Sequence, residues 1–223
     1  MDDTTWTLVE AERRSLADLL DGLTPQQWAA PSLCSEWRVR DVAAHLAMTP
    51  VGMPSVATML RAFVSARGNL WTAGRDVAVA HAERPTDELV AGLRRGAASR
   101  SRPVFVVPDN ILADLVVHGQ DIAVALELPR EVPAAAGRAT LQRIWTMGWP
   151  FHARRRVAGV QLVADDCGWS AGGGPEVHGT AARLLLLMTN RRDALEALRG
   201  PGVDVLQRAT RRAAGSARQG VRP

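Results

Sequence analysis

The chain has 223 residues, of which 47% are hydrophobic and 22% charged, and its formal net charge is +4. This length can bury one large core or two modest ones, and the composition is ordinary for a globular protein. The most apolar run, Leu184–Met188, is far shorter than the roughly 18 residues that a membrane span needs. The N-terminus, Met1–Thr4, is acidic and lacks the basic start of a secretory signal, so we expect a cytoplasmic protein.

The positive charge is concentrated at the C-terminal end of the chain. Taking the five arginines that follow Leu206 from the net charge of +4 leaves −1 for the rest of the chain. Because they stand among Ala, Gly and Ser, we expect a solvated, disordered tail over residues 208–223 rather than a nucleic-acid-binding arm. We therefore expect neither nucleic acid nor membrane as a partner. These arginines are Arg208, Arg211, Arg212, Arg218 and Arg222.

Hydrophobic periodicity predicts that the first two thirds of the chain are helical. Apolar residues recur at intervals of three and four from Trp6 to Leu23, as they do on one face of a helix. The pair Thr24-Pro25 is typical of an N-cap followed by proline in the first turn of a short helix. Asp109 is expected to cap a later helix. Further helices are expected over residues 37–48, 54–67, from 86 onward, 110–126 and 134–145.

The pattern changes in the last third of the chain. Residues 157–164 are β-branched and alternating, which predicts a strand, and residues 169–171 can pair back on it as a hairpin. A strongly apolar helix is expected from Thr180 to Met188, and a last short strand over residues 203–206.

These elements predict an α+β protein with two folded parts. We expect a helical bundle over residues 1–150, a small α/β domain over residues 151–207 and the basic tail over residues 208–223.

Two of the five histidines lie inside predicted amphipathic helices. Asp114 precedes His118 by four residues, so both project from one helix face, and Asp121 follows three residues later near that face. Together with His45 from another helix, they could supply three ligands to a divalent cation and leave a fourth position open. A single helical histidine is more often a hydrogen-bonded core residue, and the Asp-x-x-x-His spacing recurs by chance. The spacing alone therefore leaves both interpretations open.

Three motifs, in the same order, resemble the mycothiol-dependent maleylpyruvate isomerase family, which belongs to the wider DinB-like four-helix bundles. The first is Trp28–Leu46 (WAAPSLCSEWRVRDVAAHL), and the second is Leu115–Ala123 (LVVHGQDIA). The third, Asp165–Trp169 (DDCGW) followed by Gly-Pro and an apolar helix, is similar to the family's small C-terminal domain.

The resemblance implies a metal-binding helical bundle followed by a small α/β domain. Its divalent metal, most readily Zn²⁺, would be bound by His45, Asp114 and His118, with Asp121 orienting His118 or replacing Asp114 as a ligand. The implied activity is that of an isomerase or S-transferase. It would use mycothiol as thiol co-substrate and act on a small electrophile, which can be anionic.

The chain departs from the family pattern at three positions. Asp114 stands where better-known members have Glu, which implies a tighter or weaker site or the use of Asp121 instead. Arg38 replaces the usual Ser or Thr cap of the second bundle helix, a loss of around 1 kcal/mol. Asn190 replaces a glycine at the end of the C-terminal apolar helix, where Asn tolerates a left-handed conformation. The following Arg191 matches the family's arginine, and it would contact an anionic substrate or the thiol.

Two other classes of function stay open from the sequence. One is a binding module whose metal serves folding alone, and the other is a metal-dependent hydrolase that activates water instead of a thiol. Cys34 and Cys167 lack the spacing of a disulfide or CxxC motif, so we expect two structural thiols without a nucleophilic role.

Overall fold

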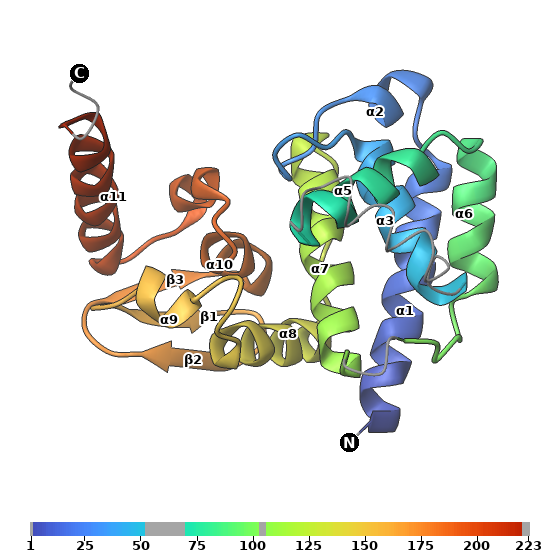
Figure 1. Ribbon diagram of the computed structural model, residues 1–223. Helices are drawn as coiled ribbons and strands as arrows, with labels where there is room; N and C mark the ends of the chain where they lie inside the picture. Colours follow the sequence, from blue (N-terminus) through green and yellow to red (C-terminus); the bar gives the residue numbers. More distant parts are fainter. Residues whose placement is uncertain (1, 52–69, 103–105, 220–223) are drawn as a thin grey trace. The chain divides into compact units, whose positions relative to one another are not determined.

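Helices make up most of the structure, a computed structural model that describes residues 2–51, 70–102 and 106–219 (Figure 1). The chain divides into two compact units, Met1–Arg130 and Glu131–Pro223. The expected α+β architecture, a helical part followed by a small α/β part, is confirmed. The division falls at residue 130 rather than at 150, because the helix over Ala134–Thr146 packs on elements of the second unit.

Unit 1 is a helical bundle. Helix α1 contacts both α6 and α7, and α3 contacts the same two helices, so these four close a ring around one core. The short helix α2 and the helix α5 pack on α3. The helices of this unit are α1 (Asp2–Asp21), α2 (Pro25–Ala29), α3 (Val39–Val51), α5 (Leu70–His81), α6 (Thr86–Arg95) and α7 (Pro108–Ala125). The fully buried core side chains include Val9, Leu16, Leu20, Val42, Leu46, Leu93, Leu112 and Ile122.

Buried charges connect α1 to the rest of unit 1. The Arg13 side chain is fully buried, and its Nη1 donates hydrogen bonds to the carbonyls of residues 96, 97 and 99, just beyond α6. Burial lowers the pKa of Arg13 to about 10. Next to it in sequence, Glu12 accepts a hydrogen bond of 2.7 Å from Arg130, and both side chains are only 4% exposed. Burial raises the pKa of Glu12, and Arg130 counteracts that shift.

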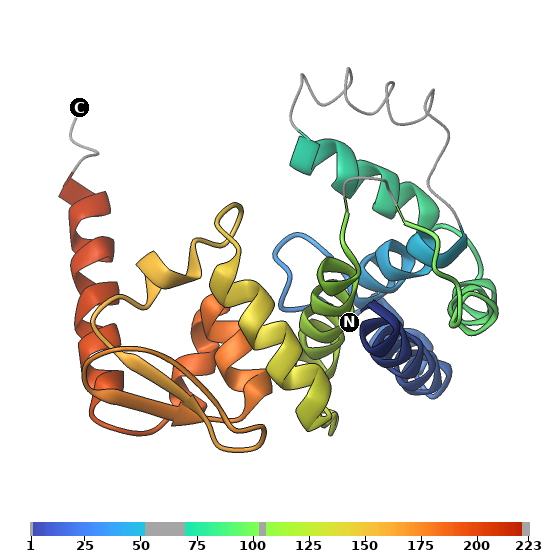
Figure 2. The same cartoon turned by 90° about the horizontal axis from the view of Figure 1, so that it is seen from below.

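Unit 2 is built on a three-stranded sheet of order β2-β1-β3. Strand β1 pairs with β2 antiparallel and with β3 parallel. Helices α8 and α10 pack against each other and against the sheet, and α11 contacts β3 (Figure 2). The elements of this unit are α8 (Ala134–Thr146), α9 (Ala153–Arg156), β1 (Gln161–Ala164), β2 (Trp169–Gly172), β3 (Glu176–Gly179), α10 (Ala181–Met188), the 3₁₀ helix η1 (Arg192–Ala197) and α11 (Gly202–Gln219).

The parallel pairing of β1 with β3 depends on a glycine run. The chain must pass from β2, on one edge of the sheet, to β3 on the other. Gly172 and Gly174 make this crossing with φ of +99° and +116°, and a Cβ at either position would collide with a backbone carbonyl oxygen. Glycine is therefore required at both positions for this topology.

Several helix boundaries differ from the sequence predictions for physical reasons. Thr24 is the N-cap of α2, as expected, and it also forms a full capping box with Gln27. The N-cap of α7 is Val107 rather than Asp109, because Pro108 takes the first helical position. Asp109 instead accepts a hydrogen bond from the Thr5 hydroxyl. The helix expected over residues 54–67 lies outside the described residues.

The C-terminal predictions need two corrections. Only residues 161–164 of the expected strand 157–164 are in a strand. The strand expected over residues 203–206 and the disordered tail expected from residue 208 are replaced by α11, which runs to Gln219. Val203 and Leu206 are three residues apart, which is a helical spacing, and the Ala and Arg that follow are strong helix formers.

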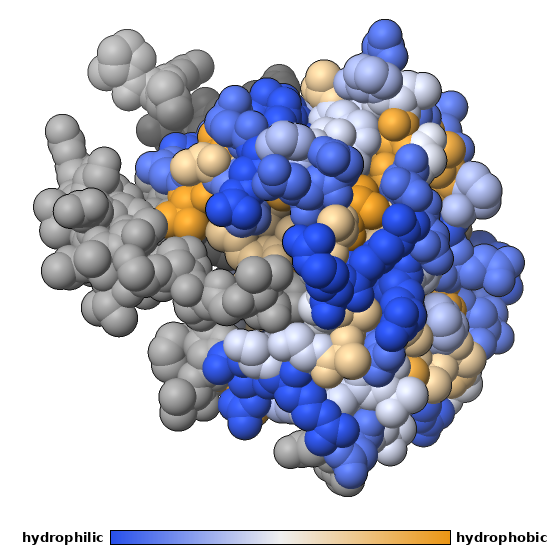
Figure 3. All heavy atoms as spheres, turned by 90° about the vertical axis from the view of Figure 1, so that its right-hand side faces the viewer, coloured by the Kyte–Doolittle hydropathy of each residue, from blue (hydrophilic) through white to orange (hydrophobic). Residues whose placement is uncertain are grey.

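Hydrophilic residues cover most of the face shown in Figure 3, with hydrophobic residues in small separate patches. Among the described residues, the large hydrophobic side chains that are exposed are Val107 and Trp149. No described helix is long and apolar enough to cross a membrane.

The buried ion pair of Glu12 gives a prediction for stability. Replacing Glu12 with Ala leaves the buried Arg130 guanidinium without its carboxylate, and we expect the free energy of unfolding to fall by about 3 kcal/mol. The matched control is Glu10→Ala in the same helix, which removes an exposed pair with Arg14 and should change stability by less than about 1 kcal/mol. Urea unfolding monitored by circular dichroism measures both. Equal losses of stability in the two variants would contradict the idea that burial makes the Glu12–Arg130 pair more important than an exposed pair.

Candidate metal centre

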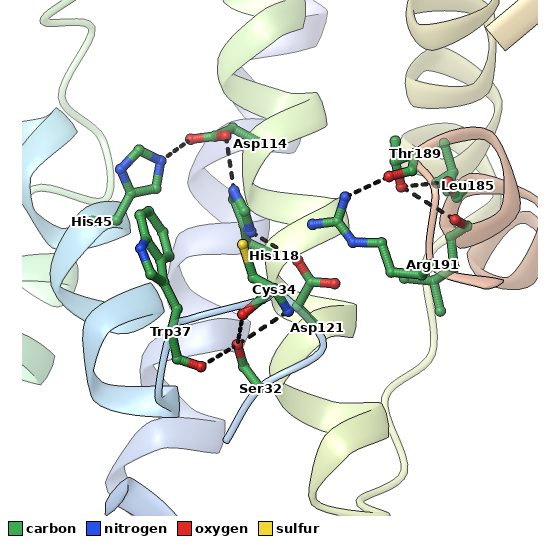
Figure 4. A network of polar contacts seen from close by, with 11 residues as sticks. Ser32, Cys34, Trp37, His45, Asp114, His118, Asp121, Leu185, Thr189 and Arg191 are labelled. Carbon is green, nitrogen blue, oxygen red and sulfur yellow. Dashed lines mark hydrogen bonds and ion pairs between the residues drawn. The ribbon is translucent and has the colours of Figure 1, made fainter. Parts of the chain in front are cut away.

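Asp114 lies between the imidazoles of His45 and His118 (Figure 4). His45 is on α3, while Asp114 and His118 lie one turn apart on α7, and the two helices are in contact. Asp114 Oδ2 is 2.9 Å from His45 Nε2, and Asp114 Oδ1 is 3.4 Å from His118 Nε2. The structure thus brings together the three side chains expected from the sequence, with one donor atom of each within 4.8 Å of the others.

The other ring nitrogen of His118 faces a second carboxylate. His118 Nδ1 lies 2.9 Å from Oδ2 of Asp121, whose side chain is fully buried. A carboxylate that accepts the Nδ1–H bond of a histidine fixes the ring and leaves the Nε2 lone pair available for a metal. The position of Asp121 is thus the one expected for a residue that orients His118.

The segment over residues 30–38 covers this part of α7. Its Trp37 ring lies against both imidazoles, with centroids 5.3 Å from His45 and 5.9 Å from His118. The Leu33 N–H donates to the backbone carbonyl of Asp121, at 3.1 Å, and so connects this segment directly to α7. A hydrogen bond within the segment stabilises its conformation: the Ser32 hydroxyl donates to the carbonyl of Trp37 at 2.9 Å. The segment therefore forms a wall of the candidate centre.

The unusual Arg38 does not leave α3 uncapped. The Asp41 carboxylate, in the first turn of the helix, accepts the backbone N–H of Arg38 at 2.8 Å. It also accepts two hydrogen bonds from the Arg38 guanidinium, at 3.0 and 2.9 Å. These bonds fix the first turn of the helix that carries His45, and Asp41 plays the part of the N3 residue of a capping box.

The donor set fits a divalent cation with an open coordination position. The ligand atoms of His45, Asp114 and His118 lie within 4.8 Å of one another. Their side chains are 30%, 38% and 13% exposed, so none of the three is sealed from solvent. Within residues 2–51, 70–102 and 106–219, no further His, Cys, Asp or Glu joins these three at the same distance. Two imidazoles and one carboxylate suit zinc, for which a fourth position would take an exogenous ligand.

The charge of Asp114 acts directly on His45. Burial opposes protonation of the His45 imidazole, but the carboxylate of Asp114 and its hydrogen bond outweigh that effect and raise the pKa of His45 above its ordinary value. The attraction that stabilises a proton on this ring also stabilises a cation, so protons and a metal compete for the same nitrogen.

Arg191, the other predicted site residue, belongs to unit 2. It follows α10, whose end is turned by Asn190 with φ of +76°, the left-handed conformation expected from the sequence. Its Nη1 donates to the carbonyl of Thr189 at 2.8 Å, and its side chain is half-buried.

Sequence reasoning missed two members of the site, Trp37 and Cys34. Cys34 was expected to be a structural thiol without a basic partner, but the structure groups its sulfur with donor atoms of His118 and Asp121. The partner is more than 80 positions away in sequence, so no local spacing could have indicated it.

Among the other histidines, His178 lies between Asp165 and Glu176, at 3.1 and 2.9 Å.

Comparisons with known proteins concern the family and the fold of the chain. The family profile of the mycothiol maleylpyruvate isomerase N-terminal domain matches residues 9–110. A crystal structure of the mycothiol-dependent maleylpyruvate isomerase matches with a TM-score of 0.50, and one of a mutant of that enzyme with 0.48. Each is 13% identical in sequence and covers 90% of this chain and 93% of its own. At this identity the likeness shows the fold alone. No curated protein matches the chain.

The hydrogen bond between His118 and Asp121 gives a prediction for metal affinity. In Asp121→Asn the negative charge behind the imidazole is lost, which weakens the ring as a donor, so we expect the dissociation constant for Zn²⁺ to rise about 10-fold or more. Competition with a chromophoric chelator measures it. Asp109→Asn on the same helix is the matched control, because Asp109 bonds to Thr5 away from the centre. An unchanged dissociation constant for Zn²⁺ in Asp121→Asn would show that Asp121 does not contribute to metal binding.

Proposed function

We propose, on the premise that residues 9–110 belong to the mycothiol maleylpyruvate isomerase N-terminal domain family, that this chain is a metal- and thiol-dependent enzyme. His45, Asp114 and His118 would bind a divalent cation, most readily Zn²⁺, and mycothiol would be the thiol co-substrate. The reaction would be an isomerisation or S-transfer on a small electrophile. The observation that carries the proposal is the three-donor set without a fourth donor of the described chain.

The charge of the donor set favours a thiol over a neutral ligand. Two neutral imidazoles and one carboxylate offset one of the two positive charges of a divalent cation, so the centre would retain a net charge of +1. A bound divalent cation lowers the pKa of a coordinated thiol and so supplies a thiolate at neutral pH. The positive centre would attract that thiolate, and the partial exposure of all three side chains leaves room for it.

The surrounding residues have separate parts in this proposal. Asp121 holds the His118 ring through Nδ1, so that Nε2 faces the cation. Trp37 packs on both imidazoles and shields them from water on that side. The contact of Asp114 Oδ2 with His45 Nε2, at 2.9 Å, keeps the α3 ligand in place beside α7. The chain thus organises the ligands before a cation binds.

The thiolate would add to an electrophilic carbon of the substrate and form a carbon–sulfur bond. In an isomerisation, addition converts a carbon–carbon double bond into a single bond that rotates, and elimination of the thiol restores the double bond in the other geometry. In an S-transfer, the carbon–sulfur bond is kept in the product. Arg191, which matches the arginine of the related family, would bind an anionic group of the substrate by charge-assisted hydrogen bonds.

The proposal predicts the behaviour of His45→Ala. Loss of one of three ligands should lower thiol transfer to a model electrophile by more than about 100-fold, because the cation no longer has its catalytic geometry. The measurement is mycothiol consumption by the zinc-loaded full-length chain, with His81→Ala on α5 as the control. Undiminished transfer by a folded His45→Ala would overturn the proposal. Turnover that does not need a thiol would point instead to a hydrolase that activates water.

The role of Arg191 has its own test. Arg191→Ala should raise KM about 10-fold for an electrophile that carries a carboxylate, and leave KM for a neutral electrophile unchanged, since only the first offers a partner to the guanidinium. Arg155→Ala, which removes an exposed arginine of the same unit, is the control. An equal effect on both substrates would show that Arg191 has a structural role only.

A further inference from the structure

A second group of ligand atoms lies on the opposite side of the His118 ring. Cys34, His118 and Asp121 each present one donor atom, and these three atoms lie within 4.8 Å of one another. Figure 4 shows the Cys34 sulfur beside the His118 ring. The group shares only His118 with the centre described above, and it offers sulfur, nitrogen and oxygen rather than nitrogen and oxygen alone.

We propose that this group is a second, thiolate-containing cation position, which uses His118 Nδ1 instead of Nε2. Sulfur and imidazole ligands select borderline and soft metals such as Zn²⁺ and Co²⁺ over Mg²⁺ or Ca²⁺. On binding, the Cys34 thiol releases its proton to solvent and a sulfur–metal bond forms. The position needs no mycothiol, so it does not depend on the proposed catalytic function.

The charges of the ligands at this second position would neutralise a divalent cation, which suits a buried position. A Cys34 thiolate and the Asp121 carboxylate carry two negative charges, which neutralise a divalent cation. Asp121 is fully buried and Cys34 half-buried, and a neutral cluster avoids the cost of placing a net charge in such surroundings. The first centre is more exposed and would keep a positive charge. The two positions thus differ in the ligands that they accept, although they share one imidazole.

The two carboxylates on either side of His118 make the two positions alternatives. A neutral imidazole has one lone pair and one N–H, so it binds a metal through one nitrogen and donates through the other. With a cation at Nε2, the Nδ1–H bond goes to Asp121 at 2.9 Å. With a cation at Nδ1, the proton moves to Nε2, where Asp114 Oδ1 lies at 3.4 Å to accept it. Each carboxylate is a ligand in one state and a hydrogen-bond acceptor in the other.

The backbone holds Cys34 in place for this role. The Ser32 hydroxyl accepts the N–H of Cys34 at 3.1 Å, and the neighbouring Leu33 N–H donates to the carbonyl of Asp121 itself. The residue that precedes the sulfur ligand is therefore hydrogen-bonded to the backbone of the carboxylate ligand.

The test is cobalt binding by the full-length His45→Ala variant, which disables the first centre and keeps Asp114 to accept the Nε2 proton. Thiolate-bound Co²⁺ has an intense near-ultraviolet charge-transfer absorption that nitrogen and oxygen ligands do not give. We expect His45→Ala to bind one Co²⁺ with this absorption. Adding Cys34→Ser should abolish the absorption, and adding Cys167→Ser, the matched control, should leave it intact.

Two results would overturn the proposal: a folded His45→Ala that gives no sulfur–cobalt absorption, or an absorption that survives Cys34→Ser. His45→Gln serves in the same way if the alanine variant does not fold. The result of the cobalt experiment can be distinguished from the result of the thiol-transfer experiment that tests the proposed function. His45→Ala that lacks thiol transfer but binds cobalt through sulfur supports both proposals. Retained thiol transfer counts against the catalytic proposal alone.

Discussion

The contact between α3 and α7 at Asp114 is the interaction on which the rest of the candidate centre depends. One carboxylate lies between two imidazoles from different helices, at 2.9 Å from His45 Nε2 and 3.4 Å from His118 Nε2. The close spacing of these groups requires that the two helices pack tightly over this turn. The buried apolar residues of the bundle supply that packing, so the core determines the geometry of the polar groups at its edge.

The segment over residues 30–38 is the second constraint. It has little regular structure of its own, but a bridge between Pro31 and Arg38 joins its two ends. Between them, the Leu33 N–H bonds to the backbone carbonyl of Asp121 on α7. Loops that carry functional side chains are useful only when the scaffold fixes them. Here the bond from Leu33 is made to Asp121, the residue whose carboxylate lies 2.9 Å from His118 Nδ1. A change in the conformation of this segment would therefore shift Asp121, and with it the contact that Asp121 makes with the His118 ring.

Local patterns sufficed for the parts of the structure that depend on neighbours in sequence. The helical stripe from Trp6, the Thr24 N-cap and the Asp114–His118 spacing were all predicted, since helix periodicity and capping are local properties. The parallel strand β3 and the grouping of Cys34 with His118 were not, because they depend on contacts between distant segments. The strand expected over residues 203–206 was wrong, because a short apolar run has no period long enough to separate strand from helix.

Three of the groups that could coordinate a cation, Asp114, His118 and Asp121, come from two turns of the single helix α7. The remaining donors come from elsewhere, His45 from α3 and Cys34 from the loop. Helix α7 would thus supply part of the donor set of either proposed cation position, and the segments that face it would supply the rest. Evolution could change the preferred metal, or the co-substrate, by altering one facing segment while the helix stays as it is. Diversification of this kind needs no new fold and no loss of the buried core.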